Sequence, residues 1–209
     1  MSADELKIST QEEREATAAE AMKDGEVFDA LFELLEGSSR SKRQRAATVI
    51  AIIGATDATR LDGYAPELAQ AANMPEEQTR WDCLNALASM AQAGLETGND
   101  ALMAAEDNLF DDRSGIVREA ALRYLCVYGA TDPTASDEVW PSLDEAIQCH
   151  HGNAEFNDML TWLVGFAGGN ISAETSAALA ERFAFDAEHA SGTLRMRSQQ
   201  IVEIHKKRK

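Results

Sequence analysis

The feature that most constrains the fold of this chain is an internal repeat of 37 to 38 residues. Arginines at positions 43, 80 and 118 are each followed by small or apolar residues at offsets +3, +4, +7 and +10. These residues are Ala46, Ala47, Ile50 and Ile53; Cys83, Leu84, Leu87 and Met90; and Ala121, Leu122, Leu125 and Tyr128. Residues at these offsets share one face of an α-helix. Because one helix pair cannot bury such a face alone, the units must stack side by side.

The same spacing continues less regularly toward the C-terminus. Asn157 precedes Leu160, Thr161, Val164 and Ala167, and Arg197 precedes Gln200, Ile201 and Ile204. Terminal copies in a stack are atypical because one flank meets water. A period of 37 to 40 residues with two helices per unit therefore predicts an all-α solenoid of about five helical hairpins.

Turn residues divide the chain into ten or eleven predicted helices, with no period-two alternation long enough to predict a strand. We expect one helix over residues 39–53, ending before Gly54, and another over 61–72. Residues 1–23 carry few large apolar side chains, so they are predicted to form an acidic N-terminal helical extension that packs weakly or stays mobile. Residues 24–209 then form the repeat domain.

One repeat carries a family resemblance. Residues 111–125, Asp-Asp-Arg-Ser-Gly-Ile-Val-Arg-Glu-Ala-Ala-Leu-Arg-Tyr-Leu, resemble the second helix of a HEAT repeat. In that family an acidic or turn segment precedes Val-Arg, and Ala and Leu occupy these offsets. The resemblance extends over about residues 24–209, and it implies a right-handed, armadillo-like superhelix that usually serves as a protein-binding scaffold.

The charge of the chain limits its partners. Nineteen basic and 36 acidic residues give a formal net charge of −17. This sign argues against general nucleic-acid binding and against adhesion to an anionic membrane surface, and it favours a basic protein or peptide. The first twenty residues lack the apolar run of a signal peptide, and no segment approaches the roughly 18 apolar residues of a membrane span. Three well-separated cysteines, Cys83, Cys126 and Cys149, suggest free thiols and a cytoplasmic location.

Candidate partner-binding residues are indicated by the helical register. Positions +1 and +5 of each second helix point away from the apolar stripe, and the resemblance implies that second helices line a concave surface. The candidates are Gln44, Thr48, Trp81, Asn85, Glu119 and Arg123, and Asp158 and Trp162 hold the same positions in the next unit. Tryptophans are favoured as interface anchors. Alternatively, the register drifts and Trp81 and Trp162 fill gaps in the core.

The recurring arginines Arg43, Arg80 and Arg118 have two interpretations. They contact a ligand, or they form a structural ladder with acidic groups in neighbouring turns, such as Asp111 or Asp112. The ladder is favoured because arginine suits fixed, partly buried ion pairs.

No catalytic or cofactor motif stands out. Cys149-His150-His151 contains metal-ligand residue types, but consecutive helical residues point about 100° apart and do not readily close one site. The sequence has no Gly-rich phosphate loop and no nucleophile elbow. We therefore expect no enzymatic activity, no cofactor and no bound metal.

The leading functional hypothesis is a non-catalytic scaffold or adaptor that binds a protein or peptide on its concave face. One alternative is a HEAT-like DNA glycosylase for alkylated bases, because Trp81, Asp82 and Trp162 are residues of the required kinds. That activity needs a cationic groove, whereas residues 46–194 hold 24 acidic and six basic residues.

A further alternative is a self-associating structural protein, a homo-oligomer built head to tail. The first 39 residues hold 11 acidic and three basic residues, whereas residues 195–209 hold six basic and one acidic residue. The basic tail is equally compatible with a solvated helix C-terminus, where cations interact favourably with the helix dipole.

Overall fold

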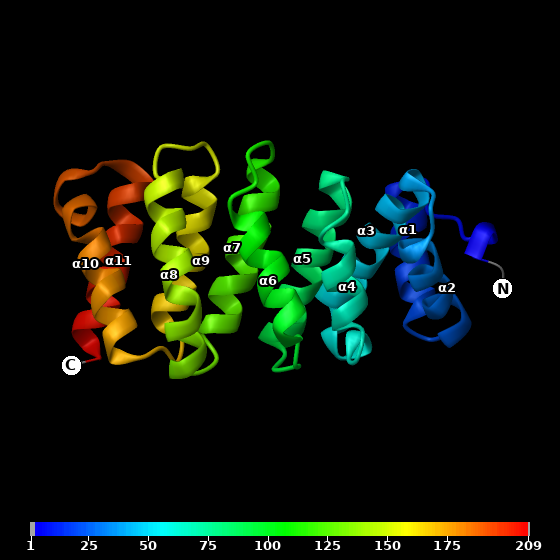
Figure 1. Cartoon of the computed structure of the whole chain (residues 1–209), viewed down its shortest axis with the longest axis horizontal. Coiled ribbons are helices and arrows are strands. Elements are labelled where there is room, and N and C mark those ends of the chain that lie inside the picture. The colour runs from blue at the N-terminus through cyan, green and yellow to red at the C-terminus, as the bar shows by residue number, and fades with distance from the viewer. Residues whose placement is uncertain (1–2, 209) are drawn as a thin grey trace. The chain divides into compact units, whose positions relative to one another are not determined.

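The computed structural model describes residues 3–208 and is built of α-helices (Figure 1). The α-helices are α1 (Gln11–Ala21), α2 (Gly25–Glu36), α3 (Arg40–Asp57), α4 (Ala65–Ala71), α5 (Glu77–Gln92), α6 (Gly98–Leu109), α7 (Gly115–Gly129), α8 (Pro133–His150), α9 (Phe156–Gly168), α10 (Ala173–His189) and α11 (Gly192–Lys207). Two short 3-10 helices, η1 (Ala3–Glu5) and η2 (Ala58–Leu61), complete the structure. No strand occurs within residues 3–208, so the predicted all-α class is confirmed.

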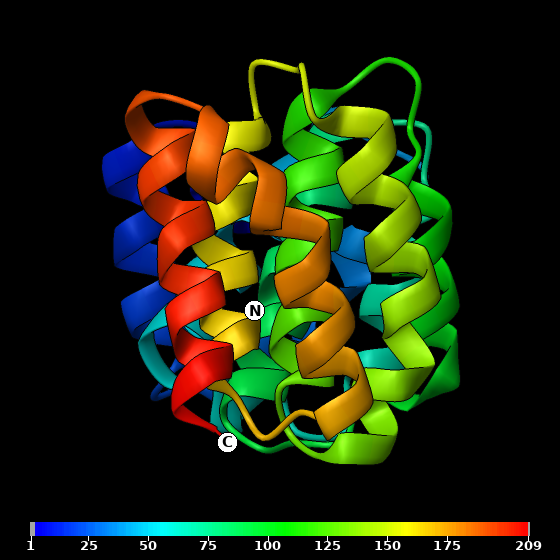
Figure 2. The same cartoon turned by 90° about the vertical axis from the view of Figure 1, so that its left-hand side faces the viewer.

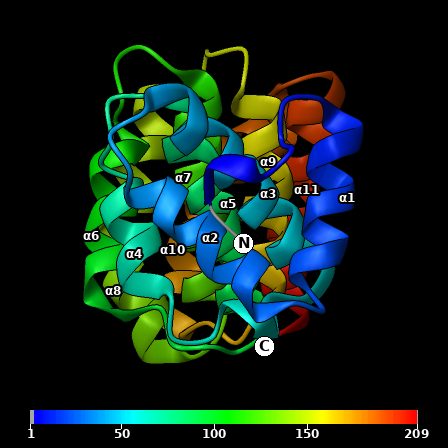
Figure 3. The ribbon, with the colours of Figure 1, turned by 90° about the vertical axis from the view of Figure 1, so that its right-hand side faces the viewer.

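The chain forms two compact units that divide near the end of α6, between Asp107 and Asn108. In the first unit, α2 packs against α3, and α4 packs against α5. Helices α3 and α5 are neighbours in one layer, whereas α2 and α4 are neighbours in the other. Helix α1 lies beside α3 and extends the α3–α5 layer (Figure 3). The predicted boundary at residue 23 stays a prediction, but α1 itself is packed.

The second unit has the same two-layer plan. Helices α7, α9 and α11 form one layer, in which each helix contacts the next. Helices α8 and α10 form the other layer, and α10 packs along α11 (Figure 2). We call the layer of α3 and α5 in the first unit, and that of α7, α9 and α11 in the second, the second-helix layer of each unit. These layers contain the second helix of each predicted hairpin.

The apolar repeat positions supply the core of both units. Ile50, Leu87 and Leu125 are each 0% exposed, as the offset pattern predicts. Full burial of one such side chain contributes about 1.5–3 kcal/mol relative to its exposure. Of the twelve residues at the repeat offsets, only Tyr128 is not fully buried.

The repeated sequence Gly-Ala-Thr-Asp, at residues 54–57 and 129–132, has two structural tasks. A Cβ atom on Gly54 would lie 2.9 Å from Leu61 Cδ1, and one on Gly129 would lie 2.5 Å from Val139 Cγ2. The glycines therefore permit close packing. Each aspartate caps the next helix, since Asp57 accepts the N–H of Thr59 at the start of η2, and Asp132 accepts two main-chain N–H groups at the start of α8.

Three helix predictions needed correction. Helix α3 does not end before Gly54 but continues to Asp57, because Gly54 is used for close packing within the helix. The helix predicted over residues 61–72 is shorter and begins at Ala65, since Pro66 fits only the first turn of a helix. The N-terminal helix is shorter than the predicted extension and begins at Gln11: a capping box of Thr10 and Glu13 starts it, and the Thr17 hydroxyl donates to the Lys7 carbonyl at 2.9 Å.

Candidate functional site

A polar cavity of about 400 Å³ opens on the second-helix layer of the first unit, between α1, α3 and α5. We call it the α1–α3–α5 cavity. Its lining residues are Gln11, Arg14, Gln44, Arg45, Thr48, Gln78, Trp81 and Asp82. Three of the predicted partner-binding residues, Gln44, Thr48 and Trp81, are among them.

Asp82 is the buried acid of this cavity and is 5% exposed. The Thr48 hydroxyl donates to Asp82 Oδ2 at 2.6 Å, and Gln78 Nε2 donates to the same oxygen at 2.7 Å. Burial raises the pKa of the Asp82 carboxyl, and these two hydrogen bonds and the charge of Arg14 oppose the shift. Oδ1 of Asp82 accepts no hydrogen bond from residues 3–208. The cavity therefore holds a carboxyl with one oxygen left for solvent or a ligand.

Two arginines come from α1 and α3 to the same cavity. Arg14 Nη1 donates to the Ser9 carbonyl at 3.1 Å, and Arg14 Nη2 donates to Gln11 Oε1 at 3.1 Å. Arg45 Nη1 donates to the Ser9 hydroxyl at 3.0 Å. The Ser9 N–H in turn donates to the carboxylate of Glu13. Residue 9 thus joins the start of α1 to α3 and fixes both guanidinium groups.

Trp81 is half-buried on α5. Its indole makes no hydrogen bond, ring stack or cation contact with residues 3–208. Asn85, one helical turn further along α5, is also half-buried but does not line the cavity. The structure therefore brings Trp81, and not Asn85, together with Gln44 and Thr48.

Three further predicted residues, Glu119, Arg123 and Trp162, form a cluster in the second unit, whereas Asp158 is exposed and makes no hydrogen bond or ion pair with them. Trp162 Nε1 donates to Glu119 Oε1 at 3.4 Å, and the Arg123 guanidinium carbon lies 4.8 Å from the Trp162 ring centroid. This distance is within the range of a cation–π interaction. Burial lowers the pKa of Arg123, and the nearby Glu119 opposes that shift. Trp162 is half-buried and therefore joins α7 to α9 at the surface of the layer.

Two of the recurring arginines form a structural ladder between successive second helices. Arg43 Nε and Nη2 donate to Glu76 at 3.1 and 2.6 Å, and Arg118 Nε donates to Glu155 at 2.8 Å. Glu76 is the N-cap residue of α5, and Glu155 is the N-cap residue of α9. Each arginine also donates to a carbonyl before its own helix, that of Gly37 for Arg43 and that of Asp111 for Arg118.

The ladder changes the titration of its acids. Hydrogen bonds from Arg43 hold the pKa of Glu76 below its usual range against the effect of burial. Burial alone would raise the pKa of Glu155, but hydrogen bonds from its own N–H and from Arg118 outweigh it and lower that pKa. The sequence predicted a carboxylate of Asp111 or Asp112 as the partner of Arg118. The carboxylate is instead that of Glu155, and Asp111 contributes its main-chain carbonyl.

The Cys149-His150-His151 segment has separate local contacts. His150 is buried, and its Nε2 lies 2.9 Å from the Leu109 carbonyl oxygen. His151 Nε2 lies 2.8 Å from Asp186 Oδ2, and Cys149 is exposed. Within residues 3–208, no three His, Cys, Asp or Glu side chains are grouped so that they could hold a metal ion. Over the same residues, no helix is both long and apolar enough to span a membrane.

A second cavity, of about 270 Å³, lies between α8 and α10 in the other layer of the second unit. Trp140, Asp144 and Arg182 line it, and Arg182 donates two hydrogen bonds to Asp144, at 2.7 and 2.9 Å. Because Arg182, the basic residue of this cavity, already pairs with Asp144, the α1–α3–α5 cavity is the better candidate site.

Sequence reasoning missed Gln11, Arg14, Arg45 and Gln78. The first two lie in α1, outside the repeat, and nothing in the repeat spacing predicts that α1 packs beside α3. Gln78 could have been found from its position four residues before Asp82, a spacing that places two side chains on one helix face.

Comparison with known proteins identifies the fold. No protein-family model matches the sequence, and no curated protein sequence matches it. A designed armadillo repeat protein in complex with the peptide (KR)4 is similar over 97% of both chains, with a TM-score of 0.71 and 16% identity. An engineered protein is similar over 98% of this chain and 97% of its own, with a TM-score of 0.70 and 19% identity.

A computationally designed armadillo repeat protein for modular peptide recognition gives a TM-score of 0.67 and 17% identity over 97% of both chains. At these identities the likeness shows the fold alone. The chain has a HEAT/armadillo-like helical repeat fold, so the predicted solenoid architecture is confirmed.

Proposed function

We propose that this chain is a non-catalytic scaffold that binds a protein or peptide through its second-helix layers. The observation that carries the proposal is the α1–α3–α5 cavity, which opens on the layer of the first unit and contains Gln44, Thr48 and Trp81. The designed armadillo protein in complex with (KR)4 has the same fold, which supports peptide binding as the class of function.

Trp81 is the anchor residue of the proposed interface. Interface hot spots are enriched in tryptophan, because its large side chain gains much from losing its contact with water. Trp162 in the second unit already contacts Arg123 and Glu119, whereas the Trp81 indole has no polar or aromatic partner within residues 3–208. Of the two tryptophans on the second-helix layers, Trp81 is therefore the one whose ring is open to a partner.

The charge of the chain favours a basic partner. With a net charge of −17, the long-range field attracts cationic polypeptides and accelerates their association. Many acidic side chains are exposed, including the α2 residues Glu26, Asp29, Glu33 and Glu36. This attraction should weaken as salt is added, because exposed charges are screened.

The chemistry of the cavity supports binding rather than catalysis. Within residues 3–208, its lining contains no histidine, cysteine, serine or lysine, and the Thr48 hydroxyl is committed to Asp82. The glycosylase alternative is not favoured either. Asp82 is buried and hydrogen-bonded to Thr48 and Gln78, while Trp162 belongs to the second unit and contacts Glu119 and Arg123.

Affinity capture with the purified full chain tests the proposal. Proteins bound by the wild type are compared with those bound by Trp81→Ala and Arg123→Glu. The matched control is Trp140→Ala, which removes a tryptophan from α8 in the other layer. We expect the first two variants to lose a specific partner that the control retains. Retention of every partner by Trp81→Ala and Arg123→Glu would refute the proposal.

Self-association is a second candidate function, favoured by the segregation of charge. Four exposed acids lie along one face of α2, at positions 26, 29, 33 and 36, while Lys206 and Lys207 are exposed near the end of α11. Head-to-tail contact between copies would pair these surfaces. Light scattering at low and high salt tests it: assemblies that dissolve in high salt support this function, and a monomer in both conditions contradicts it.

A further inference from the structure

We infer that the α1–α3–α5 cavity binds a carboxylate group of the partner, held between the guanidinium groups of Arg14 and Arg45. The group is an acidic side chain or the C-terminal carboxylate of the partner polypeptide. This inference rests on the proposed function, because it specifies the chemical group that the partner places in the cavity.

The first argument is that neither arginine donates a hydrogen bond to a carboxylate among the side chains that the structure describes, although the charge of Arg14 acts on Asp82 and lowers its pKa against the effect of burial. Among these residues, Arg14 donates only to the Ser9 carbonyl and the Gln11 amide oxygen, and Arg45 donates only to the Ser9 hydroxyl. Arg14 Nε is buried and has no hydrogen-bond partner in the same part of the chain. A buried donor without a partner is unfavourable, so an anion that accepts from it would be stabilised.

Three other arginines of the chain bind carboxylates, which is the kind of hydrogen-bond partner that Arg14 and Arg45 lack among the described side chains. Arg43 binds Glu76, Arg118 binds Glu155 and Arg182 binds Asp144 through charged hydrogen bonds. A guanidinium group matches the geometry of a carboxylate, with two parallel N–H donors facing two oxygens. Arg14 and Arg45 are positioned by neutral oxygens instead, which leaves N–H donors of both groups available.

The remaining polar groups of the cavity are also donor-rich. The Gln44 side-chain amide and the Trp81 indole N–H have no partner within residues 3–208. Asp82 is the buried acid of the lining, and Thr48 and Gln78 donate hydrogen bonds to one of its oxygens. As a carboxylate, Asp82 opposes an incoming anion, and the positive charge of Arg14 acts against this repulsion.

The net charge of the cavity lining favours a ligand group with a single negative charge. Two arginines and one aspartate give the cavity lining a formal charge of +1, the reverse of the chain as a whole. A carboxylate matches this charge, whereas a phosphate dianion would also meet the negative field of the surrounding protein. A cavity of about 400 Å³ is large enough for a side chain or a chain terminus. Such a site would select one acidic group within a partner that is otherwise basic.

Nuclear magnetic resonance of the full chain tests the inference directly. The indole N–H signal of Trp81, assigned by its loss in Trp81→Phe, is followed at constant ionic strength. The carboxylate probes are N-acetylglycine, which represents a chain terminus, and N-acetylglutamic acid α-amide, which represents an acidic side chain. The comparison probes are N-acetylglutamine α-amide and inorganic phosphate. We expect at least one carboxylate probe to shift the signal saturably and the glutamine probe not to shift it.

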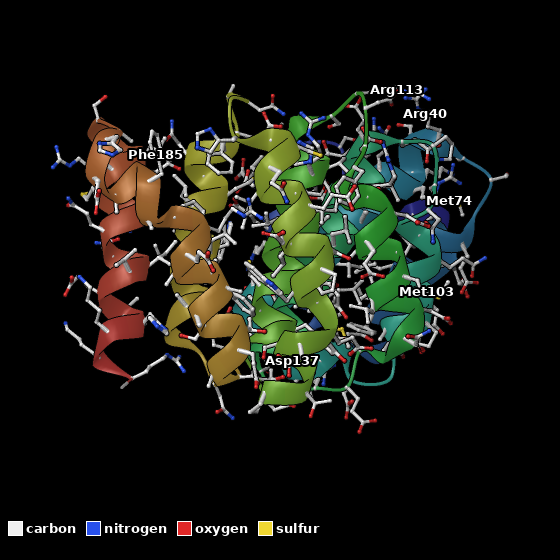
Figure 4. All side chains as sticks on the ribbon, turned by 60° about the vertical axis from the view of Figure 1, so that its left-hand side comes forward. Arg40, Met74, Met103, Arg113, Asp137 and Phe185 are labelled. Atoms are coloured by element: carbon white, nitrogen blue, oxygen red, sulfur yellow. The ribbon has the colours of Figure 1, made fainter. Side chains whose placement is uncertain are left out.

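Three variants test whether carboxylate binding depends on the charge of the cavity. Arg14→Gln and Arg45→Gln should each weaken carboxylate binding about tenfold, the loss of one charge-assisted contact. Asp82→Asn should strengthen it about threefold by removing a like charge, a gain that unfolding cannot mimic. The matched control is Arg40→Gln, which removes the same charge from an exposed position of α3 outside the cavity (Figure 4). It should change binding little.

The outcomes separate the two proposals. Equal shifts with the glutamine probe, equal effects of Arg14→Gln and Arg40→Gln, or weaker binding in Asp82→Asn would each overturn the carboxylate site. A response to phosphate alone would also overturn it, in favour of a phosphate ligand. If the chain binds a carboxylate probe but Trp81→Ala captures the same partners as the wild type, the carboxylate site is supported and the proposed function is refuted. Loss of capture in Trp81→Ala without carboxylate binding would refute only this inference.

Discussion

Arg43 of α3 binds Glu76, the N-cap residue of α5, through two charged hydrogen bonds at 3.1 and 2.6 Å. Arg43 is 8% exposed and Glu76 is 2% exposed, so solvent screens this pair little. The ion pair thus joins the second helix of one repeat to the start of the second helix of the next repeat. Arg118 and Glu155 repeat this relationship between α7 and α9.

Glu76→Gln should destabilise the protein by about 3–5 kcal/mol at pH 7, because it leaves Arg43 as an unpaired buried charge. Folding lowers the pKa of Glu76, so the ionised carboxylate stabilises the fold above its unfolded pKa of about 4.3. That stability is lost as the pH falls through the folded pKa. Denaturant unfolding should therefore show a smaller difference between wild type and variant at pH 3 than at pH 7. An equal difference at both values would contradict the assignment.

Gly129→Ala should destabilise the second unit by about 1–3 kcal/mol, because the new methyl group would lie 2.5 Å from Val139 Cγ2 and 2.9 Å from Phe166 Cε2. Gly165→Ala is the matched control inside α9, where a Cβ atom meets nothing within 4 Å. It should stabilise the protein by about 0.5–1 kcal/mol through helix propensity. Thermal unfolding of both variants measures the difference, and the same sign of change for both would be inconsistent with close packing at Gly129.

Asp82→Asn should have a pH-dependent effect of the opposite sign to Glu76→Gln. Folding raises the pKa of Asp82, so the stability that its carboxyl contributes is fully present below the unfolded pKa of about 3.9 and is lost as the pH rises through the folded pKa. The stability of Asp82→Asn relative to wild type should consequently increase between pH 4 and pH 7. Melting temperatures across this range provide the measurement, and a constant or falling difference would show that burial does not control this carboxyl.

Thiol labelling should distinguish the three cysteines. Cys83 and Cys126 are buried and burial raises the pKa of both thiols, whereas Cys149 is exposed. Because the thiolate is the reactive form, a thiol reagent at neutral pH should modify Cys149 rapidly in the folded protein and all three in denaturant. Mass spectrometry counts the modified residues. Rapid labelling of Cys83 or Cys126 under native conditions would show that the core opens more readily than its burial indicates.

Much of the fold was predictable because the repeat depends on local chemistry. The offsets after Arg43, Arg80 and Arg118 identify the buried faces of three helices, and capping residues such as Asp132 mark where helices begin. The predicted end of α3 at Gly54 was wrong, because the sequence alone does not distinguish a glycine that permits close packing from one that ends a helix. Its role depends on Leu61, which the local pattern does not reveal.

The candidate site was predictable only in part. The register placed Gln44, Thr48 and Trp81 on the correct side of their helices. It could not supply Arg14, because α1 lies outside the repeat and buries only small residues such as Ala18 and Ala21, which give no clear signal that it packs beside α3. Figure 4 shows Met103 and Phe185, two large apolar side chains that are exposed to solvent. The repeat spacing does not predict their exposure.

Site-specific photo-crosslinking in cells tests most directly whether the second-helix layer of the first unit binds a partner. A photoreactive phenylalanine analogue at position 44, in the α1–α3–α5 cavity, is compared with the same analogue at position 185, where the native Phe185 is 71% exposed on α10. We predict a discrete covalent adduct from position 44 that disappears when Trp81→Ala is added and is absent from position 185. No adduct at position 44, or one that Trp81→Ala leaves unchanged, would contradict the central claim.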